Sequence, residues 1–319
     1  MLSIIGFSLL LLLDLAPGVV AHTVPIVNAT WPNTFPKQIV ANRRRQGLTY
    51  AEYDYHHTIV HGRKAWNAPD TVDQPLAYQQ GHIFDSAYGI NTTSNNAQPS
   101  FFGHNDITEL YSRSADAFAT RPSNNYTATV IGPDGNAFAD LSASLNMYAI
   151  EEFQHVNSTC RKQPWNTFNA FYWAFSNSSI ANTDSFDNVT FASTVAASLL
   201  AALPAGTIYN ASIHTSVPGM ESRPYYGGYD NPAINGVLKF WLCDDNAAVV
   251  SFREAQKELI AQNEELGINL DSSFVAFSRA VTIYDRSRGV PFDDERAWRD
   301  LKRDQWRGDA AVPPCQNGY

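Results

Sequence analysis

The order of strand-like and helix-like segments constrains this chain more than any other feature. From residue 37 to 156 the pattern reads strand, helix, strand, strand, helix, strand, and from 167 to 284 the same order recurs without obvious sequence identity. A β-α-β-β-α-β order is typical of a ferredoxin-like unit, in which one sheet is covered by two helices. We therefore expect an α+β protein with two tandem ferredoxin-like (β-α-β-β-α-β) units packed sheet to sheet.

Hydrophobic periodicity and capping residues place the individual elements. In the first half, strands are expected at residues 37–42, 74–87, 106–111 and 147–156, and helices at 49–66 and 112–120. In the second half, strands are expected at 167–175, 207–215, 236–243 and 274–284, and helices at 186–203 and 247–265. A last helix at 292–306 has acidic residues in its first turn and basic ones near its end, as the helix dipole favours.

The N-terminal segment predicts secretion. An apolar stretch from Leu2 to Leu13 is shorter than the roughly 20 residues that a bilayer span requires. It is followed by Pro17 and by a small-residue site ending at Ala21, which predicts a signal peptide cleaved after Ala21. We expect a signal peptide at 1–21, the two units at 22–160 and 161–290, and a C-terminal helix and tail at 291–319.

The glycosylation sequons agree with secretion, because Asn-X-Ser/Thr sites are modified only in a secretory chain. Seven asparagines have this spacing: Asn28, Asn91, Asn125, Asn157, Asn177, Asn188 and Asn210. The net charge of −9 argues against nucleic acid and anionic membrane surfaces as partners. We expect a monomer or homodimer that takes a small-molecule substrate and has no membrane contact after signal cleavage.

The cysteines are odd in number, so in an oxidising compartment one is expected to stay unpaired. Cys243 follows an apolar run and is interpreted as a buried thiol. Cys160 and Cys315 lie in polar surroundings and are predicted to form a disulfide.

Several segments of the first half resemble the EthD-domain family. The helix start Gln46–Tyr53 and the following Val60-His61-Gly62 resemble the family's opening strand and helix, although Arg63 replaces the family's proline. Gly103–Tyr111 resembles the "DGxxEL" strand, and Pro133–Asp140 the "PDE…F.D" segment. The resemblance covers about residues 38 to 155, whereas the second half matches only in the order of its elements.

This resemblance implies the dimeric α/β-barrel superfamily, in which two ferredoxin-like sheets face each other and a ligand cavity lies between sheet and helices. A chain with two units would form the barrel alone. Characterised fungal relatives act in secondary metabolism as decarboxylases, dehydratases or cyclases on aromatic or polyketide intermediates. The resemblance also carries an oxidoreductase label, but no GxGxxG, haem or flavin signature is present. No cofactor is expected.

Histidines are the sharpest candidates for chemistry. His57 and His61 are four residues apart on the predicted helix and share a face, and imidazole exchanges protons near neutral pH. The family resemblance also marks His61. His104 and Asp106 face the same side of a predicted strand, where the carboxylate would orient the ring. Each group also has a purely structural interpretation. His61 would cap or support the end of the helix, and Asp106 would hold a loop through hydrogen bonds to backbone N–H groups.

Two metal hypotheses are weaker. The His57/His61 pair would need a third ligand, and the candidates His82, His104 and His155 follow no ligand spacing. His22, the first residue after cleavage, would chelate copper through its amino group and ring, but the all-β body of such oxygenases is missing. No metal ligand is predicted.

The sequence thus favours, without settling that it is an enzyme, a secreted lyase or cyclase that performs cofactor-independent acid–base chemistry (decarboxylation, dehydration or cyclisation) on an aromatic or polyketide-like molecule. His61 would be base or acid, His57 or His104 its partner, and Asp106 the orienting group, with Tyr53 positioning the substrate. A glycosylated small-molecule-binding protein and an oxidoreductase with a His-bound metal are the alternatives. The Tyr225–Tyr229 segment is either a lid or a surface turn.

Overall fold

The computed structural model describes residues 34–69, 74–88, 103–154, 156, 168–177, 187–217, 219–228, 230–243 and 246–304. The predicted signal segment, His22, His155, Asn28, Asn91, Asn157, Cys160 and Cys315 lie outside this part of the chain. Among the described residues, no helix has the length and apolar character needed to span a membrane.

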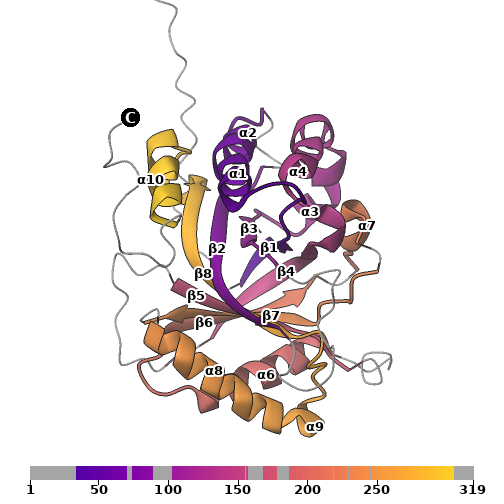
Figure 1. The fold of residues 1–319 in the computed structure, drawn as a ribbon. Coiled ribbons are helices and arrows are strands. Elements are labelled where there is room, and N and C mark those ends of the chain that lie inside the picture. Colours follow the sequence, from indigo (N-terminus) through magenta and orange to yellow (C-terminus); the bar gives the residue numbers. More distant parts are fainter. Residues whose placement is uncertain are drawn as a thin grey trace, which may run out of the picture.

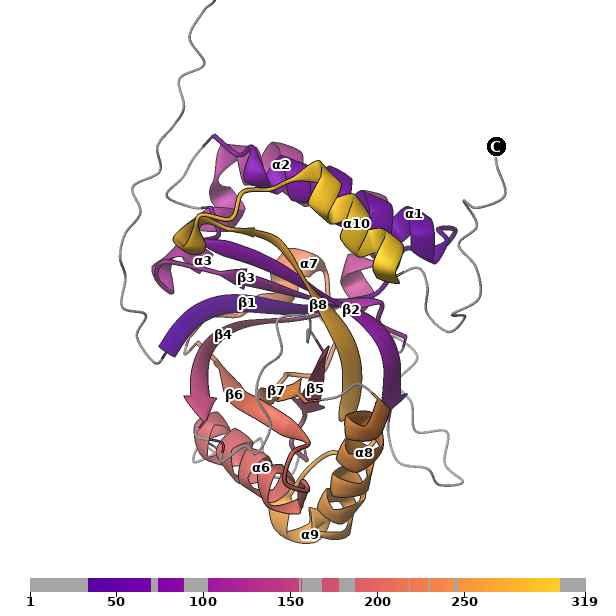
Figure 2. The ribbon, with the colours of Figure 1, turned by 90° about the vertical axis from the view of Figure 1, so that its left-hand side faces the viewer.

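Eight antiparallel strands close into a barrel in the order β1-β3-β2-β8-β5-β7-β6-β4 (Figures 1 and 2). The strands of the first half are β1 (Thr34–Asn42), β2 (Ala77–Tyr88), β3 (Asp106–Tyr111) and β4 (Leu145–Gln154). Those of the second half are β5 (Phe168–Ala174), β6 (Ile208–Ser216), β7 (Gly236–Leu242) and β8 (Phe274–Asp285). Each half forms a four-stranded sheet, and the β2–β8 and β4–β6 pairs join them. The predicted intrachain dimeric-α/β-barrel arrangement is confirmed.

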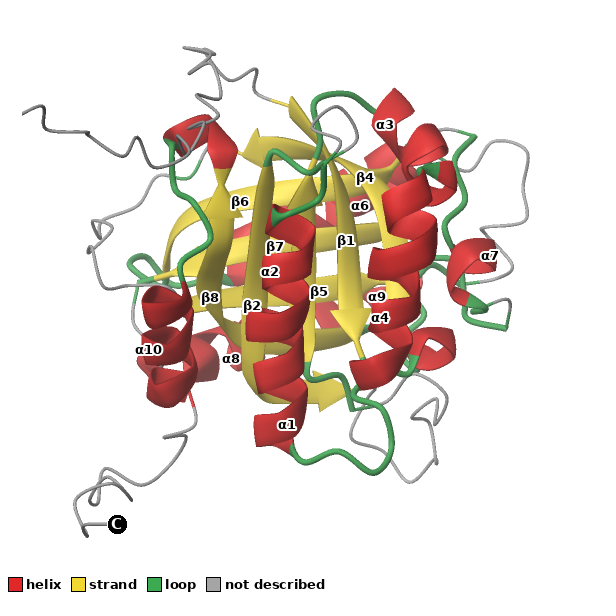
Figure 3. Ribbon diagram, turned by 90° about the horizontal axis from the view of Figure 1, so that it is seen from above, coloured by secondary structure: helices red, strands yellow, loops and turns green. Residues whose placement is uncertain are grey.

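The helices lie outside the barrel. Over the first sheet lie α1 (Tyr50–Tyr55), η1 (His56–His61), α2 (Gly62–Trp66), α3 (Asp116–Thr120), η2 (Arg121–Ser123), η3 (Thr127–Ile131), α4 (Gly132–Phe138) and η4 (Leu141–Ala143). The second half contributes α6 (Asn188–Ala202), α7 (Arg223–Tyr226), α8 (Asn246–Ala261), α9 (Asn263–Leu266), η5 (Arg286–Arg288) and α10 (Asp294–Asp304). Figure 3 shows α10 beside α1 and α2, and α7 beside α4.

The two helix–sheet interfaces differ in chemistry. Under α6 and α8 the interface is an apolar core, which includes Leu199, Leu238 and Phe252. Under the helices of the first half, the outward side of the sheet carries Gln38, Asn42 and other polar side chains that line a cavity. Since burying apolar surface is the main stabilising contribution, the second half is packed for stability and the first half leaves room for a ligand.

The barrel interior holds an apolar cluster and a charged one. Ile39, Met147 and Trp173 belong to an apolar cluster formed by strands of both halves. Near them, Lys37 pairs with Glu109 and Glu151, and Lys239 pairs with Glu109 at 2.6 Å. These four side chains come from β1, β3, β4 and β7, so the ion pairs connect the two sheets. A buried charge is tolerated only when it is paired in this way.

The disulfide prediction is wrong. Cys243 is half-buried and disulfide-bonded, so it is not a free thiol. The chain has only three cysteines, and the predicted pairing of Cys160 with Cys315 would leave Cys243 no partner within the chain. The apolar run before Cys243 is strand β7, which ends at Leu242, so the cysteine lies just beyond the buried strand rather than within it.

The described sequons are of two kinds. Asn125 and Asn177 are exposed. Asn188 is half-buried at the start of α6, where its side chain donates to Ser216 Oγ and accepts from Asn235 Nδ2. Asn210 is half-buried on strand β6. Occupancy of the sequons remains a prediction.

Candidate functional site

A cavity of about 500 Å³ lies between the first sheet and its helices. Its floor includes one row of residues across the sheet, because the strand register places Tyr148 beside Gln38, Gln38 beside Leu110, and Leu110 beside Tyr78. The walls come mainly from η1, η3 and α4. A cavity of this size with a few convergent polar groups is the usual form of a small-molecule site.

The wall that carries the histidines is a π-helical turn. A capping box between Thr49 and Glu52 starts the helix, which continues through η1 at His56–His61 into α2. The wider π turn changes which side chains share a face, and such turns are frequent at functional sites. Here His56 and His61 both reach Asp134 on α4, at 3.0 Å and 2.8 Å.

His61 is oriented by Asp134 and meets the cavity. Its Nδ1 donates to Asp134 Oδ2, and Nε2 has no hydrogen-bond partner among the described residues. The ring lines the cavity and stands edge-on to Tyr78 at a centroid distance of 6.5 Å. Burial lowers the pKa of His61 below its ordinary 6.5, although the bond to Asp134 opposes that shift. A neutral ring with a fixed Nδ1 proton presents the lone pair of Nε2, which is the form of a general base.

Asp134 remains ionised beside His61. Burial acts to raise the pKa of Asp134, but hydrogen bonds from His61, Lys64 and His56 outweigh it and hold that pKa well below the ordinary range. The carboxylate therefore stays an acceptor and keeps the proton of His61 on Nδ1.

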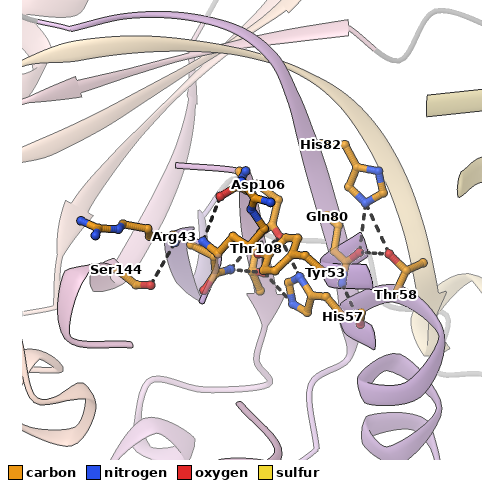
Figure 4. A network of polar contacts seen from close by, with 12 residues as sticks. Arg43, Tyr53, His57, Thr58, Gln80, His82, Asp106, Thr108 and Ser144 are labelled. Atoms are coloured by element: carbon orange, nitrogen blue, oxygen red, sulfur yellow. Dashed lines mark hydrogen bonds and ion pairs between the residues drawn. The ribbon is translucent and has the colours of Figure 1, made fainter. Parts of the chain in front are cut away.

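A second chain of hydrogen bonds runs from Asp106 through His57 to Tyr78. Figure 4 shows Asp106, His57 and Gln80 of this network. His57 Nδ1 lies 2.6 Å from Asp106 Oδ2, and His57 Nε2 lies 2.7 Å from the Tyr78 hydroxyl. Gln80 Nε2 donates to the Tyr78 oxygen at 2.7 Å, so the Tyr78 proton points to His57 and the His57 proton to Asp106. Burial raises the pKa of Tyr78 well above 10, so its hydroxyl stays a neutral donor.

Asp106 is held by further donors. Tyr53 donates to Asp106 Oδ2, and Asn42 Nδ2 donates to Oδ1 at 2.8 Å. Burial would raise the pKa of Asp106, but the interactions with His57, Tyr53 and Asn42 hold it below the ordinary value. The group is therefore a buried anion that holds the His57 proton on Nδ1.

The structure brings together three of the five predicted site residues, one of them with a different partner from the one expected. His57 and His61 line the same cavity, with ring centroids 5.7 Å apart, and Asp106 orients a histidine. That histidine is His57 rather than His104. These positions leave the catalytic roles themselves as predictions.

The other two residues have different surroundings from those expected. Tyr53 is fully buried and binds Asp106, so it positions the carboxylate and does not reach a ligand. His104 stacks with Tyr88 and Phe274 away from the cavity lining, and burial lowers its pKa to about 3. The prediction that His104 and Asp106 face the same side assumed a regular strand through both residues. Strand β3 begins at Asp106, so His104 precedes the strand and the alternation does not apply to it.

Sequence reasoning missed Asp134 and Tyr78. Asp134 lies in the Pro133–Asp140 segment that resembles the family pattern, and a carboxylate just after Pro in a first helical turn was an available signal. Tyr78 is one tyrosine among 15, and its partner His57 is 21 residues away, so no local spacing marks it.

The histidine pair is not arranged to bind a metal. Both nitrogens of His57 are engaged, by Asp106 and Tyr78, which leaves only His61 Nε2. In the described part of the chain, only Glu109, Glu151 and His214 bring three ligand atoms within 4.8 Å of one another. Lys37 and Lys239 already neutralise these carboxylates inside the barrel.

Comparison with known proteins identifies the first half. Residues 45–142 match the family model of the EthD domain, so the predicted resemblance is confirmed. No functionally curated protein matches the sequence significantly. Solved structures with a similar fold include an anthrone oxidase-like protein (8% identity, 80% of this chain and 95% of that one, TM-score 0.46). A variant of chlorite dismutase from Candidatus Nitrospira defluvii is also similar (8%, 84% and 95%, TM-score 0.42). Likenesses at this level carry no argument about chemistry.

Proposed function

We propose that this protein, which carries an EthD domain in its first half, is a secreted enzyme that performs cofactor-independent acid–base chemistry on a small aromatic or polyketide-like molecule. The observation that carries the proposal is the pairing of His61, in the wall of the cavity, with Tyr78, in its floor. One is a neutral base held by Asp134, and the other is a neutral hydroxyl that ends the Asp106–His57 chain.

His61 Nε2 would remove a proton from a carbon next to a carbonyl group of the substrate, which leaves an enolate. The carbonyl oxygen, which gains negative charge, would accept a hydrogen bond or the proton from Tyr78. In the resting site the Tyr78 proton lies toward His57 Nε2, so this donation would require His57 to take a second proton from solvent at Nε2. His57 would then pass that proton to the Tyr78 oxygen while Tyr78 donates to the substrate. Donors placed in advance at a developing oxyanion are worth several kcal/mol in a site that excludes water.

The same pair of groups serves two of the reactions that the family resemblance implies, cyclisation and dehydration. Cyclisation requires an enolate that attacks a second carbonyl, and dehydration requires removal of a proton followed by protonation of a leaving hydroxyl. In each case one proton leaves to His61 and one arrives from Tyr78, so the protons balance. General acid–base assistance of this kind contributes about 10²- to 10⁴-fold in rate.

Three aromatic rings of the cavity lining fit a flat ligand. Phe138 lines the cavity and stacks on His57 with centroids 4.4 Å apart, and Tyr148 lies on the floor. Tyr225 adds a third ring to the lining. Aromatic walls bind planar molecules through apolar contact and offset stacking.

Secretion is part of the proposal. Cys243 is disulfide-bonded, and Asn125 and Asn177 are exposed in their sequons. Stable disulfides are typical of oxidising compartments.

The experiment follows hydrogen–deuterium exchange at the acetyl group of 6-acetyl-2-naphthol in D₂O by NMR. We expect the protein to accelerate this exchange, and His61→Ala to reduce the acceleration by about 10²-fold or more. His104→Phe is the matched control, because it keeps a ring in the stack with Tyr88 and Phe274 outside the cavity. Exchange that is unaffected by His61→Ala would contradict the proposal. Saturable binding of the probe without exchange would favour the binding protein.

A further inference from the structure

The second half of the chain contributes one wall of the cavity in the first half. We name residues Ser222–Gly228, which contain α7, the tyrosine strap. It lies beside α4, on the far side of the barrel from α6 and α8 (Figures 1 and 3). Two of its residues, Tyr225 and Tyr226, line the cavity. The segment therefore lines the cavity and is not an inert surface turn.

The strap is attached to the first half at several points. Ser222 Oγ donates to the carbonyl of Asn146 at 2.9 Å. Asn231, three residues after the strap, donates from Nδ2 to the carbonyl of Ser142 at 3.0 Å. A Cβ placed on Gly132 would lie 2.9 Å from the Tyr225 hydroxyl, so the glycine allows a close approach. These contacts hold the strap as a fixed wall, and they place its tyrosine side chains relative to the residues of the first half.

Tyr226 has a hydroxyl proton to give. Its oxygen accepts from Gln38 Nε2 at 2.7 Å, and Gln38 Nε2 also donates to Asn146 Oδ1 at 3.2 Å. Among the described residues, no acceptor takes the Tyr226 proton. A phenol whose oxygen already accepts a hydrogen bond, and whose ring lines a cavity, is arranged to donate to a ligand.

The strand register gives the distance between this group and the acid–base pair. Gln38 and Tyr78 both pair with Leu110, on opposite sides of strand β3. Neighbouring strands are about 4.8 Å apart, so the two polar side chains are about 10 Å apart with an apolar residue between them. That spacing matches a molecule of about two fused rings with an oxygen at each end.

We propose that Tyr226, held by Gln38, is a specificity-determining residue that donates a hydrogen bond to a phenolic or carbonyl oxygen at the end of the substrate remote from His61 and Tyr78. The inference rests on the proposed function, since it assumes that the cavity is the substrate site. The side-chain amide oxygen of Gln38, Oε1, has no partner in the described part of the chain. It would accept a hydrogen bond from a substrate hydroxyl at the same place.

The test compares the dissociation constants of 6-acetyl-2-naphthol and 2-acetylnaphthalene, which differ only in the remote hydroxyl, by fluorescence titration. We expect Tyr226→Phe to lower the preference for the hydroxylated probe by about three- to tenfold, the value of one hydrogen bond. Gln38→Leu is a second variant that should lower the same ratio. Tyr209→Phe, on strand β6 outside the cavity lining, is the matched control and should leave it unchanged.

The outcomes separate this inference from the proposed function. If wild type exchanges the acetyl protons but Tyr226→Phe and Gln38→Leu keep the wild-type preference, the inference is overturned and the acid–base proposal stands. If His61→Ala loses exchange and keeps the wild-type preference, the two ends of the cavity act separately, as proposed. If neither probe binds wild type saturably, the site assignment fails and the inference with it.

Discussion

Asp134 Oδ2 lies 2.8 Å from Nδ1 of His61, although the two residues are 73 positions apart in the chain. This contact fixes the tautomer of the ring that lines the cavity, and it joins helix α4 to the π-helical turn η1. It has a counterpart in the Asp106–His57 contact at 2.6 Å, so two carboxylates hold two histidines beside one cavity. The predictions below separate the roles of these pairs.

Asp134→Asn should reduce turnover about 10- to 100-fold, because the ring of His61 loses its anionic partner. The pH dependence of kcat/KM tests this role more specifically than the rate does. The pKa of His61 lies below 6.5, so the acidic limb of kcat/KM should lie below pH 6.5. Asp134 acts to raise that pKa, so its removal should move the limb to still lower pH.

Lys64→Met is the control for this variant. It removes another partner of Asp134 and keeps the contact with His61. Because Lys64 is partly exposed, we expect turnover to change less than threefold. If the acidic limb of kcat/KM moved equally in Asp134→Asn and Lys64→Met, a specific action of Asp134 on His61 would be contradicted.

Tyr78→Phe should lower kcat by about 10²- to 10³-fold with a smaller change in KM, since the lost donor acts on charge that develops during the reaction. Asp106→Asn should act through the same hydroxyl. The double variant Tyr78→Phe with Asp106→Asn should therefore be no slower than Tyr78→Phe alone, as measured by single-turnover exchange. Additive losses would show that Asp106 acts independently of Tyr78.

Glu109→Gln should destabilise the protein by about 3–5 kcal/mol, because Lys37 and Lys239 would keep buried charges without this partner. The pKa of Glu109 is lowered to about 2 in the folded state, chiefly by Lys239 and Lys37 against the opposing effect of burial. Its contribution is therefore complete above the ordinary pKa of 4.5 and is lost as the pH falls from 4.5 towards 2.

Urea unfolding at pH 7, 4 and 2.5 measures this dependence. The variant should lose less stability than wild type between pH 4.5 and 2. Glu254→Gln, which breaks the exposed pair with Lys257, should cost less than about 1 kcal/mol. Equal costs for the two variants would mean that the barrel charges do not connect the sheets.

Glycan mapping of protein secreted from a eukaryotic host tests the sequons. We expect glycans on the exposed Asn125 and Asn177 and none on Asn188, whose side chain already bonds to Ser216 and Asn235. Peptide mass spectrometry before and after enzymatic deglycosylation gives the result. A glycan on Asn188 would require those two bonds to break.

The sequence by itself determined the local elements, because their signals lie within a few neighbouring residues. Alternation on β1 separates Ile39 in the barrel from Gln38 at the cavity, and β3 spans the predicted residues 106–111. The cap at Thr49 and the shared face of His57 and His61 are equally local. These signals were enough for the fold class and for the two histidines of the cavity lining.

Only the tertiary structure decided which groups meet. Asp134 reaches His61 because α4 packs beside η1, and Tyr226 reaches Gln38 across 188 positions because the barrel closes. The alternation of β1 did not reveal that Lys37 faces two glutamates inside the barrel, since its partners lie on other strands. Pairwise contacts of this range depend on how whole sheets and helices pack, and spacing along the chain does not encode them locally.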